Sequence, residues 1–103
     1  MNSNKYELVI CIVNEGFSEA VMDAAKTAGA TGGTVLSGHG TANKQAEEFF
    51  NISIEPLKDI VLIVVPSDIK DAVLKAVYKN VGFNTSGKGI AFSVPIDDAV
   101  GIK

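Results

Sequence analysis

The sequence predicts an α+β domain of the ferredoxin-like type, with the element order βαββαβ, a four-stranded antiparallel sheet and two helices on one face of it. Three observations favour this class. Four short apolar runs are typical of strands, two segments follow the helical period of 3.6 residues, and glycine or proline stands at most borders. At 103 residues the chain is long enough for one domain and too short for two, so residues 1–103 are expected to form a single domain.

The first strand is expected at residues 6–13, where both alternating sets of side chains are apolar. The polar triplet 14–16 ends it. Ser18 is expected to cap a helix that runs to Ala28, and Gly29 suits the left-handed conformation that ends helices. The helix is expected to bury a stripe of small apolar residues, namely Val21, Ala24, Ala25 and Ala28.

Three strands and a second helix are expected in the rest of the chain. Strands are expected at residues 34–37, 60–65 and 90–94, because these runs are short and apolar. Ser67 is expected to cap a helix over residues 68–81. Its buried stripe follows the helical period and consists of Ile69, Ala72, Val73, Ala76 and Val77.

The connection at residues 38–56 is long for so small a domain. Such loops are usually functional or disordered. Its polar part, residues 41–48, is expected to be mobile without a ligand, although residues 43–50 could form a turn or two of helix. The loop is therefore a candidate functional segment.

Both faces of the first and third strands are apolar, yet two helices can cover only one face of the sheet. No further sequence remains to cover the other face. The sequence therefore predicts a homo-oligomer that buries it.

Composition excludes several functions. The net charge of -3 argues against nucleic acid as a partner. The single cysteine excludes an internal disulfide. No apolar run reaches the roughly 20 residues that span a bilayer, and no hydrophobic leader is present, so we expect a cytoplasmic protein that is not an integral membrane protein.

Two glycine-rich loops are the candidate ligand site. One, Thr85–Gly89, precedes the last strand, and the other, Ser37–Thr41, follows the second strand. Glycines let the backbone approach an anion and point its N–H groups at it. All nine basic residues are lysines, so an anion here would be held by backbone N–H groups and lysine charges, without arginine. Together the loops indicate an anion- or nucleotide-binding cleft.

Three segments together resemble the P-II signal-transduction family over nearly the whole chain. They are Gly29-Ala-Thr-Gly-Gly-Thr-Val, Ile63-Val-Val-Pro, and the closing Gly87-Lys-Gly-Ile-Ala-Phe-Ser-Val-Pro-Ile-Asp-Asp-Ala-Val-Gly-Ile. The resemblance implies a trimer whose clefts between subunits bind adenine nucleotides. It also implies that residues 38–56 correspond to the T-loop, which contacts a target enzyme or transporter.

The resemblance also implies which residues hold the nucleotide. Those on the base and sugar side are Ile12, Thr34, Gly38, Gly40 and Val64. The phosphate-side loop consists of Gly87, Lys88 and Gly89, and Lys58 approaches the phosphates from the base of the long loop. The remaining candidates are His39 and Thr41 in the first glycine loop and Lys103, which stands where the family has an arginine.

The chain departs from the family at Ile90, where a lysine is usual, and lacks both closing arginines. The effector therefore stays open among ATP, ADP, AMP, a cyclic nucleotide and another small anion. His39 could equally be a structural or exposed residue. No catalytic or metal-binding residue is predicted.

The favoured function is a non-enzymatic, P-II-like regulator that senses a small effector. A regulatory module that binds an amino acid or another metabolite is the alternative on the same fold. An acylphosphatase-like enzyme is disfavoured because such enzymes resemble a phosphate cradle that contains an arginine. This chain has no arginine. A metal-binding trimer would need several histidines or cysteines, and there is one of each.

Overall fold

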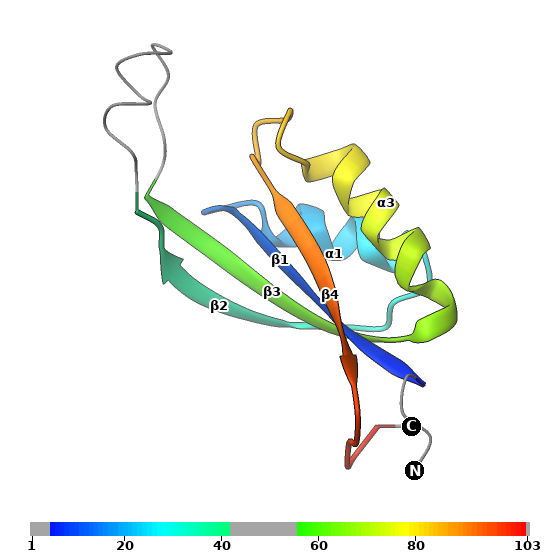
Figure 1. Cartoon of the computed structure of the whole chain (residues 1–103). Coiled ribbons are helices and arrows are strands. Elements are labelled where there is room, and N and C mark those ends of the chain that lie inside the picture. The colour runs from blue at the N-terminus through cyan, green and yellow to red at the C-terminus, as the bar shows by residue number, and fades with distance from the viewer. Residues whose placement is uncertain (1–4, 42–55, 103) are drawn as a thin grey trace.

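The structure, a computed structural model, describes residues 5–41 and 56–102. The elements follow in the order β1 (Tyr6–Asn14), α1 (Ser18–Thr27), β2 (Thr34–His39), β3 (Leu57–Pro66), a 3-10 turn (Ser67–Ile69), α3 (Lys70–Val81) and β4 (Ile90–Ile96) (Figure 1). The predicted βαββαβ order is therefore confirmed.

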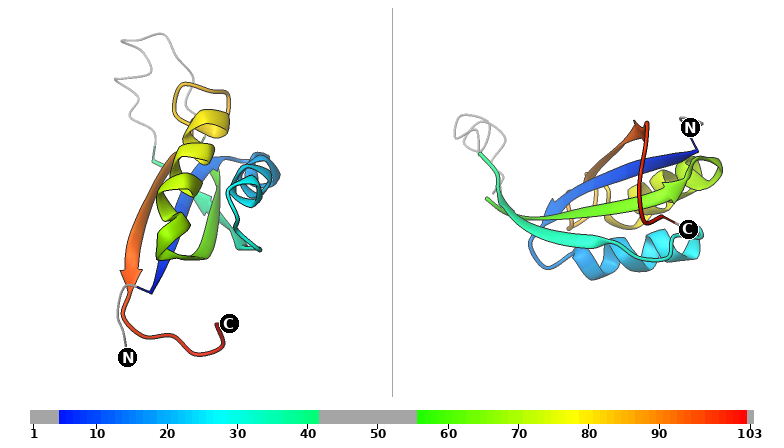
Figure 2. Two further views of the ribbon diagram at one scale, coloured as in Figure 1. Left: turned by 90° about the vertical axis from the view of Figure 1, so that its right-hand side faces the viewer. Right: turned by 90° about the horizontal axis from the view of Figure 1, so that it is seen from below.

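The four strands form one sheet in the order β2-β3-β1-β4, and every neighbouring pair is antiparallel. Both helices pack against the same face of this sheet (Figure 2). The predicted ferredoxin-like arrangement is confirmed. Neither described helix is long and apolar enough to cross a membrane.

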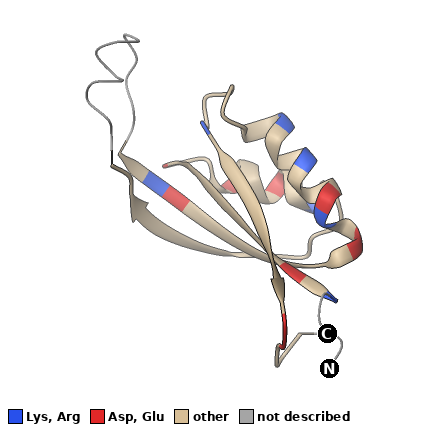
Figure 3. Ribbon diagram, in the orientation of Figure 1, with Lys and Arg blue, Asp and Glu red and all other residues tan. Residues whose placement is uncertain are grey.

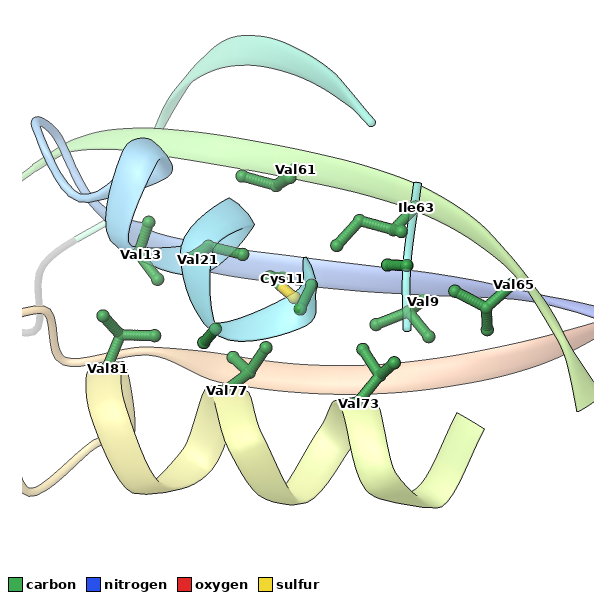
Figure 4. Packing of buried hydrophobic residues seen from close by; sticks show 13 residues of the cluster. Val9, Cys11, Val13, Val21, Val61, Ile63, Val65, Val73, Val77 and Val81 are labelled. Atoms are coloured by element: carbon green, nitrogen blue, oxygen red, sulfur yellow. The ribbon is translucent and has the colours of Figure 1, made fainter. Parts of the chain in front are cut away.

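The core lies between the sheet and the two helices (Figure 4). It consists mainly of small branched residues, because the alanine-rich α1 lets the layers approach closely. The sheet contributes Val9, Cys11 and Val13 from β1 and Val61, Ile63 and Val65 from β3. The helices contribute Val21, Ala24 and Ala25 from α1 and Val73, Val77 and Val81 from α3.

The opposite sheet face is apolar, and no described helix covers it. Side chains that face each other across antiparallel strands share a face, so the register sets Ile10 between Phe92 and Leu62, and Ile12 between Ile90 and Ile60. Ile90 is 51% exposed and Phe92 44%. The charged residues of the described chain lie mostly on the helices and near strand ends, which leaves the middle of the sheet without charge (Figure 3).

The helix starts differ from the prediction. Phe17, not Ser18, is the N-cap of α1, and its carbonyl accepts the N–H of Val21 at 3.1 Å. Phe17 packs against the core, so burial rather than a polar cap sets this start. Ser67 opens a 3-10 turn instead of capping an α-helix, and α3 begins only at Lys70.

The prediction of a buried stripe is wrong at one residue. Ala72 is exposed on α3, because the core-facing line of that helix runs through Val73, Val77 and Val81. Ala28 of the first stripe is half-buried against the core. Gly29 has a φ of +110°, which confirms the predicted left-handed helix end.

The hairpin strands extend further than predicted, so the long connection is shorter. β2 continues to His39 and β3 begins at Leu57. Beyond them, the N–H of Gly40 donates to the carbonyl of Pro56 at 2.6 Å and closes the hairpin. The expected helical turn at 43–50 lies outside the described residues, as does the expected mobile stretch from residue 42 onward.

The buried thiol provides a pH-dependent test of the core. Burial raises the pKa of Cys11 to about 11 by disfavouring the thiolate. The unfolded chain therefore loses this proton at lower pH than the folded chain, and the free energy of unfolding should fall between about pH 9 and pH 11. In urea titrations the wild type should lose more stability over this range than Cys11→Ala, in which the other titrating groups are unchanged. Equal losses in the two proteins would contradict this burial effect.

Candidate functional site

One row of paired residues crosses the sheet near the end of β1. Gly38 of β2 lies opposite Lys58 of β3, and Lys58 lies opposite Asn14 of β1. The backbone N–H of Asn14 then donates to the carbonyl of Gly87 at 2.8 Å. Three spacings of about 4.8 Å put the two glycine-rich loops about 14 Å apart, at opposite edges of the sheet. The two loops therefore do not form one cleft within a subunit.

Lys58 lies on the open face at the base of the long connection. Its ammonium group donates a hydrogen bond of 2.7 Å to the side-chain oxygen of Asn14. Two glycines make room for the side chains of Lys58 and Ile60. A Cβ on Gly40 would lie 3.2 Å from Lys58 Cε, and one on Gly38 would lie 2.8 Å from Ile60 Cδ1. The glycines of this loop thus serve close packing around Lys58.

The second glycine loop returns the chain from α3 to β4. Thr85 donates to the carbonyl of Gly82 through its N–H at 2.9 Å and its hydroxyl at 2.7 Å. The N–H of Lys88 donates to Thr85 O at 3.1 Å and that of Gly89 to Val81 O at 2.8 Å. The N–H groups of Lys88 and Gly89 are thus already used within the chain. Of the three amides of the predicted phosphate-side loop, only that of Gly87 could turn to an anion without breaking one of these bonds.

Lys88 has a different partner from Lys58. Its φ of +50° is unusual for a residue with a side chain, and its ammonium nitrogen lies 5.5 Å from the centroid of the Phe83 ring. Phe83 is 61% exposed, so both groups stand at the surface beside the β4 edge. The two lysines expected to share one anion are therefore held by different partners.

A surface cleft of about 570 Å³ lies at the other end of the sheet. Two predicted residues, Thr34 and Val64, line it. Thr34 precedes Gly38 by four residues, which is about 13 Å along β2. The rest of the lining comes from the turn after α1, the adjoining strands and the C-terminal segment: Tyr6, Gly29, Ala30, Thr31, Gly32, Gly33, Leu62, Pro66, Gly101 and Ile102.

The predicted site residues thus fall into separate groups. Thr34 and Val64 line the cleft, while Ile12 lies in the middle of the open face. His39 and Thr41 are exposed at and just beyond the end of β2, and Lys103 lies outside the described residues. The described residues of this set do not form one site within a single copy of the chain.

The sequence prediction missed Asn14, which connects the groups at the end of β1. The available signal was a polar side chain directly after an apolar strand, and it was interpreted only as a strand breaker. Its role depends on which strands lie beside β1. The partners of Asn14 are 44 and 72 residues away along the chain.

Comparisons with known proteins agree with the fold. Residues 6–103 match the family described as Nitrogen regulatory protein P-II. A search of curated protein sequences found no match. Among solved structures, PII from Arabidopsis thaliana bound to citrate has 23% identity and a TM-score of 0.71, and the match covers 95% of this chain and 83% of that one.

Two further structures are similar. CPII from Thiomonas intermedia K12, bound to ADP, AMP and acetate, has 15% identity and a TM-score of 0.67 over 97% of this chain and 94% of that one. The GlnK–ATP complex of B. subtilis has 19% identity and a TM-score of 0.63 over 93% and 85%. At these identities the similarity shows a shared fold.

The glycine at the start of β4 provides a structural test of the second loop. A Cβ on Gly89 would overlap the carbonyl oxygen of Val81 and lie 2.9 Å from Val13 Cγ1. Gly89→Ala should therefore lower the free energy of unfolding by about 1–3 kcal/mol. Gly32→Ala is the control, because its Cβ would meet nothing within 4 Å. Denaturant titrations at equal protein concentration compare the two, and equal effects would contradict the close packing of this loop.

Proposed function

Because the chain belongs to the P-II family of nitrogen regulatory proteins, we propose that it is a cytoplasmic, non-enzymatic signal-transduction regulator. Three copies assemble, an adenine nucleotide binds between them, and the 38–56 segment contacts a target protein. One observation carries the proposal. The two glycine-rich loops lie at opposite edges of one sheet. The first loop of one copy can therefore meet the second loop only of another copy.

The open sheet face drives the assembly. It carries three apolar rows that cross the strands, and the exposed residues among them include Leu36, Val64, Ile90, Phe92 and Val94. Exposed apolar surface of this extent on a small domain marks an interface. In a closed ring of identical copies each sheet buries its open face against its neighbours.

The proposed nucleotide site lies where neighbouring sheets meet. The β2 edge of one copy supplies the end with Gly38 and Lys58, and the β4 edge of the next supplies the loop with Gly87 and Lys88. Backbone N–H groups and ammonium groups are suited to a phosphate. The bound ADP and AMP of CPII and the ATP of GlnK support an adenine nucleotide as the effector.

The long connection is proposed to transmit the signal. It leaves the sheet at Gly40 and returns at Pro56, and these two residues are joined by a hydrogen bond. Lys58 lies two residues beyond this closure, with its side chain against Gly40. An anion that draws Lys58 away would therefore act at the point where the connection starts and ends.

Nucleotide titration by calorimetry tests the effector site. Lys58→Ala and Lys88→Ala should each weaken the binding of AMP and ADP by about tenfold to a hundredfold, because a hydrogen bond to a charged group contributes roughly 1.5–3 kcal/mol. ATP should bind no better than ADP, because the sequence has no arginine to hold a third phosphate. Lys79→Ala, an exposed lysine on α3, is the control. No heat with any nucleotide would remove the effector site from this proposal.

Light scattering at micromolar concentration tests the assembly. The wild type should have three times the mass of one chain. Phe92→Asp, in the middle of the open face, should reduce the mass to that of one chain, because burying an unpaired carboxylate is costly. Ala72→Asp adds the same charge on the exposed side of α3 and should leave the trimer intact. A monomeric wild type would exclude the trimer.

A further inference from the structure

Asn14 uses its backbone and both ends of its side-chain amide at the end of β1. We propose that Asn14 is a positioning residue that couples Lys58, at the base of the long connection, to the glycine loop at residues 85–89. The inference rests on the proposed function, since it takes Lys58 as the cation that meets the effector's phosphate.

The contacts of Asn14 extend from β3 to the glycine loop. Its Oδ1 accepts from Lys58 Nζ at 2.7 Å, and its Nδ2 donates to the carbonyl of Ser86 at 3.1 Å. Only one orientation of the amide satisfies an ammonium donor on one side and a carbonyl acceptor on the other. The backbone N–H also donates to Gly87 O at 2.8 Å. Lys58 and Ser86 therefore share a single planar group.

A planar amide transmits changes from one end to the other. The ammonium group on Oδ1 polarises the amide and strengthens the hydrogen bond from Nδ2. If Lys58 shifts toward an anion while it keeps this bond, the amide turns with it, and the hydrogen bond from Nδ2 to Ser86 O weakens as its geometry changes. The position of Lys58 is thereby communicated to the backbone of the glycine loop.

The backbone around Asn14 provides a fixed support for this movement. The N–H of Glu15 donates to Leu57 O at 3.1 Å, and the N–H of Gly16 donates to Asp59 Oδ2 at 3.0 Å. These two bonds hold the turn after β1 to the start of β3, on both sides of Lys58. The Asn14 side chain can therefore turn while its main chain stays in place.

The neutral charge of asparagine also matters. Lysine has three donors, and the bond to Asn14 uses one without neutralising the charge. Within residues 5–41 and 56–102 the only ion pair is that between Lys70 and Asp71. Lys58 thus keeps its charge and two donors for a phosphate. An aspartate at position 14 would pair with it and compete with the effector.

Amide hydrogen exchange of the ligand-free protein tests the coupling directly. The amides of Thr85, Lys88 and Gly89 are suitable reporters because each donates a hydrogen bond within the chain. Lys58→Ala should speed their exchange by about twofold to fivefold, as expected for a weakened neutral hydrogen bond. In an Asn14→Ala background Lys58→Ala should add nothing. Unchanged exchange in Lys58→Ala, or equal changes in both backgrounds, would overturn the coupling.

Titration with AMP and adenosine tests the effect on binding. Asn14→Ala should weaken the binding of AMP by about threefold to tenfold and leave the binding of adenosine unchanged. General damage to the fold would weaken the binding of both. Asn14→Asp should weaken AMP at least as much, because its carboxylate neutralises Lys58. Asn80→Ala is the matched control, since Asn80 Nδ2 donates to Ala76 O at 2.8 Å on the exposed part of α3.

A double-mutant cycle separates this inference from the proposed function. If Asn14 acts through Lys58, the double variant should bind AMP as weakly as Lys58→Ala alone. Additive losses would overturn the role of Asn14 while leaving the nucleotide site standing. A wild type that binds neither AMP nor adenosine would overturn the proposed function, and the exchange measurement would then decide the coupling by itself.

Discussion

The antiparallel register between β1 and β3 is the constraint on which the core, the open face and the candidate site all depend. It pairs Val9 with Ile63 and Cys11 with Val61 beneath the helices. A slip of one residue would exchange the two faces of a strand. Both faces are apolar here, so polarity cannot set the register. The buried residues on the helix side of β1 are valines and a cysteine, which suits close approach by the alanine-rich α1, while leucine and isoleucine lie on its open side.

The same register gives the sheet its functional arrangement. It sets Lys58 opposite both Asn14 and Gly38, and so places the base of the long connection in line with the end of β1. The hydrogen bond from Asn14 to Gly87 extends this line to the β4 edge. The polar groups thus form a row across one end of a largely apolar face. The proposed assembly through that face and the proposed binding at its end are therefore linked in one surface.

The fold was largely predictable because its signals are local. Apolar runs, the helical period and Gly29 identified the four strands and two α-helices of the described residues, and the family resemblance agreed with them. The errors came at borders. Phe17 replaced Ser18 as the N-cap because its ring packs on the core, and the hairpin strands extended to His39 and Leu57 because each pairs with the other. Packing and pairing partners distant in sequence decide such borders.

The candidate site was less predictable for the same reason. Glycine patterns marked a loop at residues 85–89, but residues 37–39 of the other predicted loop belong to β2. The patterns did not show that the two segments stand at opposite edges of the sheet. Nor did they show that the N–H groups of Lys88 and Gly89 are used within the chain. Asn14 carries no motif, and its importance arises only from the strands on either side of it.

The sequence by itself determined the order of elements, the two apolar faces of the central strands and the absence of arginine among its basic residues. Each of these is a property of neighbouring residues or of residue counts. The tertiary structure decided which face the helices cover, which side chains Lys58 and Lys88 contact, and how far apart the two glycine loops lie. These depend on strand order and register, and thus on contacts between segments far apart in the chain. Such contacts leave no periodic signal within any one of those segments.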